Sequence, residues 1–118
     1  FGTKGKQVRD CLHIDDLCEL INKQVNKIDE YTGNYYNVGG GINNTTSLVE
    51  LSDTLNSMMK VDDKPIILEK SRPSDQKIYI SDITKVSKDF NWQPKIGLSQ
   101  GLQSVIDWLN IENLDWVD

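Results

Sequence analysis

Residues 35–59 read YYNVGGGINNTTSLVELSDTLNSMM, and two patterns in this stretch decide the fold. Two tyrosines and a valine among residues 35–38 precede three glycines, which predicts a short strand that ends in a turn. Behind them, leucine and methionine recur at helical spacing, and Ser47 followed by Glu50 is typical of a helix capping box. A strand succeeded by a helix predicts an α/β protein.

The same alternation continues in both directions along the chain. Apolar residues at helical spacing predict four helices, the first with Asp16 and Glu19 as its expected capping box. The predicted helices span residues 16–28, 47–59, 82–90 and 98–109. The predicted strands span residues 35–38, 66–68 and 78–80, with a weaker pattern at 8–14.

The predicted strands are few and short for the number of helices. A free-standing α/β domain has a sheet of about five or six strands, so this chain is short of sheet. Its first ten residues are polar and contain glycine, as in the middle of a loop. We therefore expect the chain to be the second half of a longer protein.

Composition and charge narrow the classes of function. The 118 residues include 18 acids and 13 bases, for a net charge of −5, whereas a nucleic-acid binder would carry a basic face. No run approaches the roughly 18 apolar residues of a membrane span, and no secretory leader is recognisable. Cys11, Cys18 and His13 are too few and too poorly spaced to favour a zinc site. We expect a cytoplasmic protein with reduced thiols and with no nucleic-acid or membrane partner.

The glycine run at 39–41 follows a predicted strand, where a phosphate-binding loop could lie. A dinucleotide loop requires Gly-x-Gly-x-x-Gly, but the third glycine is replaced here by Asn44. No acidic residue is suitably placed about 20 residues further on. A tight turn beside other backbone is therefore favoured over a cofactor loop.

Arginine is rare in this chain, since Arg9 and Arg72 are the only two among thirteen bases. Both stand in loop-like settings, and the planar guanidinium suits bidentate binding of phosphate or carboxylate. Internal salt bridges, with Asp10 and Asp75 as partners, are the alternative that the sequence leaves open.

No catalytic group is marked out. His13 has no serine or cysteine nucleophile as an evident partner, so a hydrogen-bonded structural imidazole is favoured over a catalytic base. Asp15 and Asp16 are neighbours at a predicted helix start and are better explained by capping than by acid–base chemistry.

Seven segments, taken in order, resemble the extended short-chain dehydrogenases/reductases, the NAD-dependent sugar-nucleotide epimerases and dehydratases. They are GKQVRDCLHIDDL at 5–17, YNVGGG at 36–41, SLVEL at 47–51, RPSDQ at 72–76, DITK at 82–85, FNWQPK at 90–95 and LSQGL at 98–102. Within the family, the segments at 5–10 and 75–77 look most like the CDP-tyvelose (CDP-paratose) 2-epimerase branch. UDP-sugar 4-epimerases are also similar.

The resemblance implies a substrate site at matching positions. In this family the two arginines clasp the diphosphate of a sugar nucleotide, which implies that role for Arg9 and Arg72. It likewise implies that Asp75 accepts from ribose hydroxyls and that Tyr79 lies near the nucleotide.

The resemblance also implies what this chain lacks. The family's glycine-rich NAD loop and Tyr-x-x-x-Lys pair belong to its amino-terminal half, and neither occurs here. Residues 1–118 are therefore expected to be the carboxy-terminal substrate-binding lobe, an α/β unit of about four helices and a few short strands without the Rossmann half. It would bind a CDP- or UDP-sugar, have no catalytic residues of its own, and leave NAD to the full-length parent.

The expected partners are the sugar nucleotide and the amino-terminal Rossmann half of the same protein. Apolar surface left uncovered without that half would favour self-association. Two alternatives remain at this point: a stand-alone binding or interaction module, and the substrate lobe of a nucleotide-sugar dehydratase.

Overall fold

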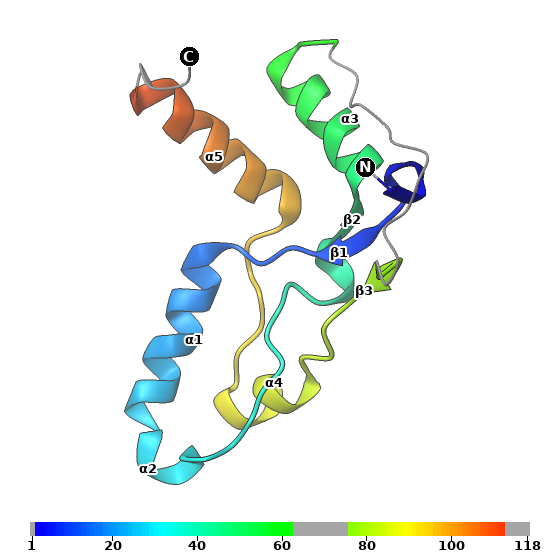
Figure 1. Cartoon of the computed structure of the whole chain (residues 1–118). Helices are drawn as coiled ribbons and strands as arrows, with labels where there is room; N and C mark the ends of the chain where they lie inside the picture. Colours follow the sequence, from blue (N-terminus) through cyan, green and yellow to red (C-terminus); the bar gives the residue numbers. More distant parts are fainter. Residues whose placement is uncertain (1, 63–75, 113–118) are drawn as a thin grey trace.

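A three-stranded sheet lies near the middle of the molecule in the computed structural model, which describes residues 2–62 and 76–112 (Figure 1). The central strand is β1 (Val8–Asp10), which pairs antiparallel with β2 (Thr45–Ser47) and parallel with β3 (Ile78–Tyr79). Strand order β2-β1-β3 therefore brings together three segments that are far apart in the sequence. The predicted small α/β unit is confirmed.

Helices make up most of the rest, and the four predicted ones are present with shifted ends. They are α1 (Ile14–Asn26), α3 (Leu48–Met59), α4 (Thr84–Phe90) and α5 (Leu98–Glu112). Three short elements were not predicted: the single-turn helix α2 (Ile28–Tyr31) and the 3₁₀ turns η1 (Gly2–Gly5) and η2 (Ile42–Asn44). In Figure 1, α3 and α5 rise as two arms on one side of the sheet, while α1, α2 and α4 lie on the other.

The hydrophobic core lies on the α1 and α4 side. Its buried members are Leu20 of α1, Val86 and Phe90 of α4, and Trp92 just beyond α4. The Phe90 ring also contacts two tyrosine rings, with centroids 4.9 Å from Tyr31 and 5.2 Å from Tyr36. Aromatic pairs at this spacing add to the stabilisation that comes from burial.

Residues 35–38 do not form the predicted strand. Tyr36 and Val38 pack against the core, but the segment has no strand partner among the described residues. A strand requires a neighbour to satisfy its backbone groups, and strand-forming residue types cannot supply one. The predicted strand at 66–68 lies outside the described residues.

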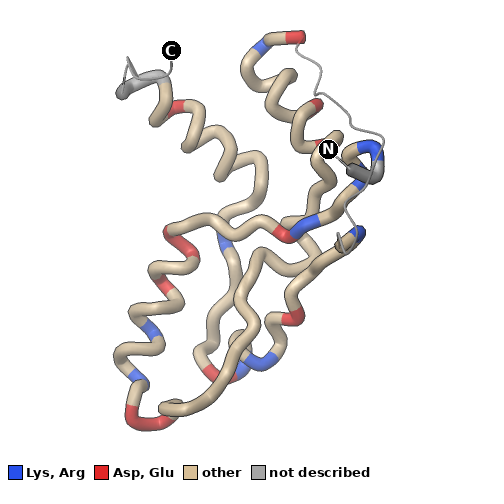
Figure 2. The backbone as a smooth tube through the Cα atoms, viewed as in Figure 1, with Lys and Arg blue, Asp and Glu red and all other residues tan. Residues whose placement is uncertain are grey.

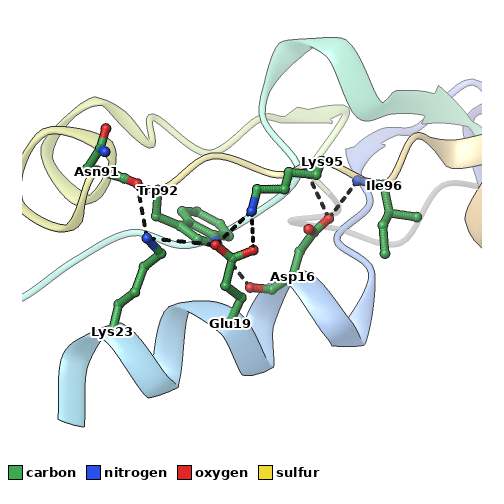
Figure 3. Close-up of polar contacts among 7 residues, drawn as sticks. All are labelled: Asp16, Glu19, Lys23, Asn91, Trp92, Lys95 and Ile96. Atoms are coloured by element: carbon green, nitrogen blue, oxygen red, sulfur yellow. Dashed lines mark hydrogen bonds and ion pairs between the residues drawn. The ribbon is translucent and has the colours of Figure 1, made fainter. Parts of the chain in front are cut away.

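The first helix begins differently from the prediction. Its N-cap is His13, whose Nδ1 accepts a hydrogen bond from the Asp15 amide at 3.2 Å. Asp16 lies instead inside the first turn and is 2% exposed. Its carboxylate accepts from the backbone amides of Lys95 at 3.1 Å and Ile96 at 2.9 Å (Figure 3). The prediction of a capping box made by Asp16 and Glu19 is therefore wrong, because the Asp16 carboxylate binds the backbone at 95–96 rather than the start of its own helix.

The capping box of α3 is confirmed. The Ser47 side chain accepts from the Glu50 amide at 3.2 Å, and the Glu50 carboxylate accepts from the Ser47 amide at 2.8 Å. This reciprocal pair satisfies two amides that the helix itself leaves without partners. Because Ser47 also ends β2, the box joins α3 rigidly to the sheet.

Candidate functional site

The central strand places Arg9 between two neighbours. The register pairs Arg9 with Thr46 on β2 and with Tyr79 on β3. Side chains at paired positions of neighbouring strands point to the same face of a sheet, so Arg9 and Tyr79 share one face. Arg9 is half-buried and Tyr79 is exposed, which leaves this face open on its β3 side.

The Arg9 guanidinium is held by two backbone carbonyls. Nη1 donates to the carbonyl of Val8 at 2.7 Å, and Nη2 donates to the carbonyl of Gln76 at 2.9 Å. Gln76 is the last residue of the RPSDQ segment at 72–76, which we call the second arginine segment because it contains Arg72, so Arg9 contacts that segment. Arg72 and Asp75 themselves lie outside the described residues.

No carboxylate within the described part of the chain neutralises Arg9. Its sequence neighbour Asp10 points to the opposite face of the strand, as alternation requires. There, Asp10 Oδ2 accepts from the amides of Gly41 at 3.1 Å and Ser81 at 3.2 Å. The Arg9–Asp10 salt bridge left open by the sequence is thus absent from the described residues. The role of Asp10, which ties β1 to two later segments, was not foreseen.

The glycine run forms a turn packed against other parts of the chain. A Cβ added to Gly40 would collide with the carbonyl of Cys11, and one added to Gly39 would collide with Asp10 and Ser81. Gly41 has φ of 68°, a left-handed conformation that favours glycine. The predicted tight turn beside other backbone is confirmed.

This turn does not fit a dinucleotide cofactor. Its Gly41 amide is already bound to the Asp10 carboxylate, whose negative charge would oppose a phosphate. Only a three-residue 3₁₀ turn follows, instead of the α-helix whose N-terminus would receive a pyrophosphate.

A cleft of about 900 Å³ lies beside the glycine turn. It is lined by residues 40–44, 80–84 and 93–97, together with Ser87 and Lys88. Neither Arg9 nor Tyr79 lines it, so the cleft and the arginine face are separate features.

The other candidate groups have structural roles. His13 is the α1 N-cap, and its Nε2 lies 3.1 Å from Ser104 Oγ on α5, so the expected hydrogen-bonded imidazole is confirmed.

Both cysteines are free, and burial, with a smaller contribution from Asp10, raises the pKa of the Cys11 thiol. A raised pKa keeps that thiol protonated and poorly nucleophilic.

Helix α1 carries acidic residues in its first half and a lysine in its last turn, as Figure 2 shows. Among the described residues, no three histidine, cysteine or carboxylate side chains gather closely enough to hold a metal ion. None of the helices in that same part of the chain has the length and apolar character needed to cross a bilayer.

Comparison of the sequence with known proteins identifies relatives of this chain. Residues 2–105 match the family model described as GDP-mannose 4,6 dehydratase. The chain is 36% identical over 112 residues to the CDP-paratose 2-epimerase of Salmonella typhi, covering 92% of this chain and 32% of that protein. It is 31% identical over 122 residues to a dTDP-glucose 4,6-dehydratase of Xanthomonas campestris, covering 96% of this chain and 33% of that protein. The chain thus spans about a third of the length of these curated relatives.

Solved structures show the same relationship. The UDP-glucuronic acid 4-epimerase of Bacillus cereus, in complex with UDP-glucuronic acid and NAD, superposes with a TM-score of 0.82 at 25% identity. That match covers 95% of this chain and 34% of the epimerase. The dTDP-glucose 4,6-dehydratase of Bacillus anthracis, in complex with NAD, gives a TM-score of 0.73 at 28% identity over 98% of this chain and 35% of the dehydratase.

Proposed function

This chain belongs to the extended short-chain dehydrogenase/reductase family of nucleotide-sugar epimerases and dehydratases, and from that premise we propose that it is the substrate-binding lobe of a nucleotide-sugar epimerase. The lobe binds the nucleoside diphosphate part of the substrate. The remainder of the enzyme, an amino-terminal Rossmann half, binds NAD and carries the catalytic tyrosine and lysine. The complete enzyme works in the cytoplasm.

One observation carries the proposal: the half-buried Arg9 has no carboxylate partner among the described residues and is oriented by two neutral carbonyls. A guanidinium has five N–H donors, and two hydrogen bonds leave others for a ligand. An uncompensated cation at a partly buried position favours an anionic ligand. A diphosphate is the anion that the family's substrates present.

The second arginine segment, RPSDQ at 72–76, completes the proposed site. The bond from Arg9 to the Gln76 carbonyl supports a site made by this segment and by the segment at 5–17 that contains Arg9, because Gln76 directly follows Asp75. Arg72 is the second diphosphate ligand and Asp75 the acceptor for ribose hydroxyls. Tyr79, on the same sheet face as Arg9, lies beside the nucleotide.

The family's chemistry sets a limit on what the lobe does alone. NAD supplies hydride transfer in the complete enzyme, and the tyrosine of the Tyr-x-x-x-Lys pair acts as the base. This sequence has no such pair, and its glycine turn is occupied by its own carboxylate. The chain alone therefore binds without turning over any sugar nucleotide. Measurable epimerisation by the purified 118-residue chain with added NAD would contradict this.

Binding is tested by calorimetric titration of CDP and UDP into the complete enzyme. Replacing Arg9 by alanine loses a charge-assisted contact of about 1.5–3 kcal/mol, so affinity falls by about 10- to 150-fold. Arg72→Ala raises KM by a similar factor. The matched control is Lys77→Ala, an exposed cation next to Gln76, which leaves affinity within about threefold. Equal effects of Arg9→Ala and Lys77→Ala would remove Arg9 from the site.

A dehydratase is the second candidate, favoured by the match to the GDP-mannose 4,6 dehydratase family model and by the Xanthomonas relative. The lobe would bind the same diphosphate in either enzyme. Product analysis separates the two reactions, since a dehydratase releases a 4-keto-6-deoxy sugar and an epimerase releases an isomer of its substrate.

A further inference from the structure

Strand β3 is held to the central strand by a very short ladder. It has two residues and lies beside β1 in the order β2-β1-β3 (Figure 1). Just before it, the Val8 amide donates to the Lys77 carbonyl at 2.9 Å. A ladder of this length specifies the position of a strand weakly, because register depends on the pattern of paired residues.

Two consecutive side chains of β1 hold the two ends of β3. At one end, Arg9 Nη2 donates to the Gln76 carbonyl at 2.9 Å. At the other end, Asp10 Oδ2 accepts from the Ser81 amide at 3.2 Å. Tyr79 lies between these two points, so its position depends on both contacts.

The Asp10 carboxylate is also shared with the glycine turn. The same Oδ2 atom accepts from the Gly41 amide at 3.1 Å. Gly41 and Ser81 are both buried, so water is poorly placed to replace the carboxylate. Because a buried amide without an acceptor is costly, both segments would have to shift if Asp10 were removed.

We propose that Asp10 is a positioning residue for nucleotide binding, which fixes Tyr79 and the Gln76 carbonyl relative to the Arg9 guanidinium. Asp10 points to the face of the sheet opposite Arg9, so it does not contact a ligand that Arg9 binds. It acts through the Ser81 amide, which determines where β3 lies. The inference rests on the proposed function, because it requires the nucleotide to bind on the Arg9 face.

The sign of the effect separates positioning from simple electrostatics. Asp10 places a negative charge one residue from the arginine that the diphosphate would contact. Like charges repel, so removing this charge would by itself strengthen the binding of an anion. A positioning role predicts the opposite, since the groups that bind the nucleotide would be displaced.

Calorimetric titration of CDP and UDP into the complete enzyme is the test. Asp10→Ala should weaken nucleotide binding by about 10-fold or more, because ligand contacts depend steeply on geometry. Asp16→Ala is the matched control, since its carboxylate also accepts from two backbone amides, at 3.1 and 2.9 Å, but fixes α1 instead of the sheet. This control should leave nucleotide affinity close to that of the wild type. Equal losses in the two variants, or tighter binding by Asp10→Ala, would overturn the inference.

A milder substitution guards against misfolding. Asp10→Asn keeps an oxygen acceptor and loses the charge, so its loss of affinity should be smaller than that of Asp10→Ala. If the alanine variant does not fold, Asp10→Asn is compared with Asp16→Asn by the same criterion.

Steady-state kinetics of the complete enzyme supply a readout that general destabilisation would not give. Asp10 variants should raise KM and leave kcat almost unchanged, because the lost interactions bind the nucleotide and not the reacting atoms. A fall in kcat at unchanged KM would contradict the positioning role.

Arg9→Ala is titrated beside these variants so that the two proposals can fail separately. Wild-type affinity in Arg9→Ala would refute the proposed function. Weak binding by Arg9→Ala, together with wild-type binding by Asp10→Ala, would refute the positioning role alone.

Discussion

The indole Nε1 of Trp92 donates to the backbone carbonyl of Asp16 at 3.0 Å, across 76 positions of sequence. Both residues are buried, and the Asp16 carboxylate binds the amides of residues 95 and 96 at the same place (Figure 3). Lys95 Nζ adds an ion pair to Glu19 at 2.7 Å on the solvent side. Together these contacts fix α1 to the turn that follows α4.

Removing the Asp16 carboxylate should destabilise the fold. Asp16→Ala leaves two backbone amides without their charged acceptor, so we expect a loss of about 2–3 kcal/mol in the free energy of unfolding, measured by urea denaturation. Asp15→Ala is the control, since the Asp15 side chain is 75% exposed and its carboxylate lies 3.6 Å from His13 Nδ1, which is itself a hydrogen-bond acceptor. A similar loss in the control would assign the effect to the helix start rather than to the anchor.

The contribution of the α3 capping box to stability should be measurable by changing either Ser47 or Glu50. Ser47→Ala removes one side-chain acceptor, and the expected cost is about 1 kcal/mol in unfolding free energy. Hydrogen bonds from Ser47 lower the pKa of Glu50, so its stabilising contribution is present above its ordinary pKa and is lost as the pH falls through the lowered value. Denaturation at a series of acidic pH values should therefore show wild type and Glu50→Gln converging as the pH falls. A constant difference at every pH would contradict the capping role of the charge.

The phenol of Tyr36 should titrate at unusually high pH. Burial, followed by its hydrogen bond to Asp89 and the charge of Asp89, raises the pKa of Tyr36 from 10.0 to about 12. Since the folded state holds the proton more tightly, this contribution is complete below pH 10 and is lost as the pH rises towards 12. Phenolate absorbance should show a late transition that Tyr36→Phe abolishes. If the variant keeps that transition, another tyrosine is responsible.

The glycine turn gives a steric test. Gly40→Ala would drive a methyl group into the Cys11 carbonyl, and we expect a loss of at least about 2 kcal/mol in unfolding free energy. Gly97→Ala is the control, because no heavy atom beyond its two chain neighbours lies within 4 Å of its added Cβ. That change should alter stability by less than about 1 kcal/mol. Thermal unfolding of the two variants side by side is the measurement.

Local patterns predicted the helices well. The Ser47 and Glu50 box and the apolar spacing of α3 depend on residues within one turn of each other, so the sequence contains all the partners. The Asp16 prediction failed for the opposite reason. Its partners are the backbone amides of residues 95 and 96, and nothing in the sequence around them indicates that they donate to a carboxylate about 80 residues earlier.

The sheet was harder to predict because pairing is non-local. Residues 35–38 have strand composition without a described strand partner. By contrast, β2 at 45–47 consists of two threonines and a serine, small polar residues that the sequence analysis did not predict as a strand. At the site, the rarity of arginine singled out Arg9. Its orientation by the Val8 and Gln76 carbonyls requires the register of β1 and β3, which the sequence does not reveal.

The central position of β1 in the sheet affects how the chain can fold while it is being synthesised. Of the three described strands, β1 is translated first, its neighbours β2 and β3 follow it by tens of residues, and the donors for Asp16 come later still. A nascent chain therefore leaves the buried Asp16 carboxylate without its backbone donors until residue 96 has been translated. Premature termination before residue 95 would yield a product whose Asp16 carboxylate lacks both of its backbone donors.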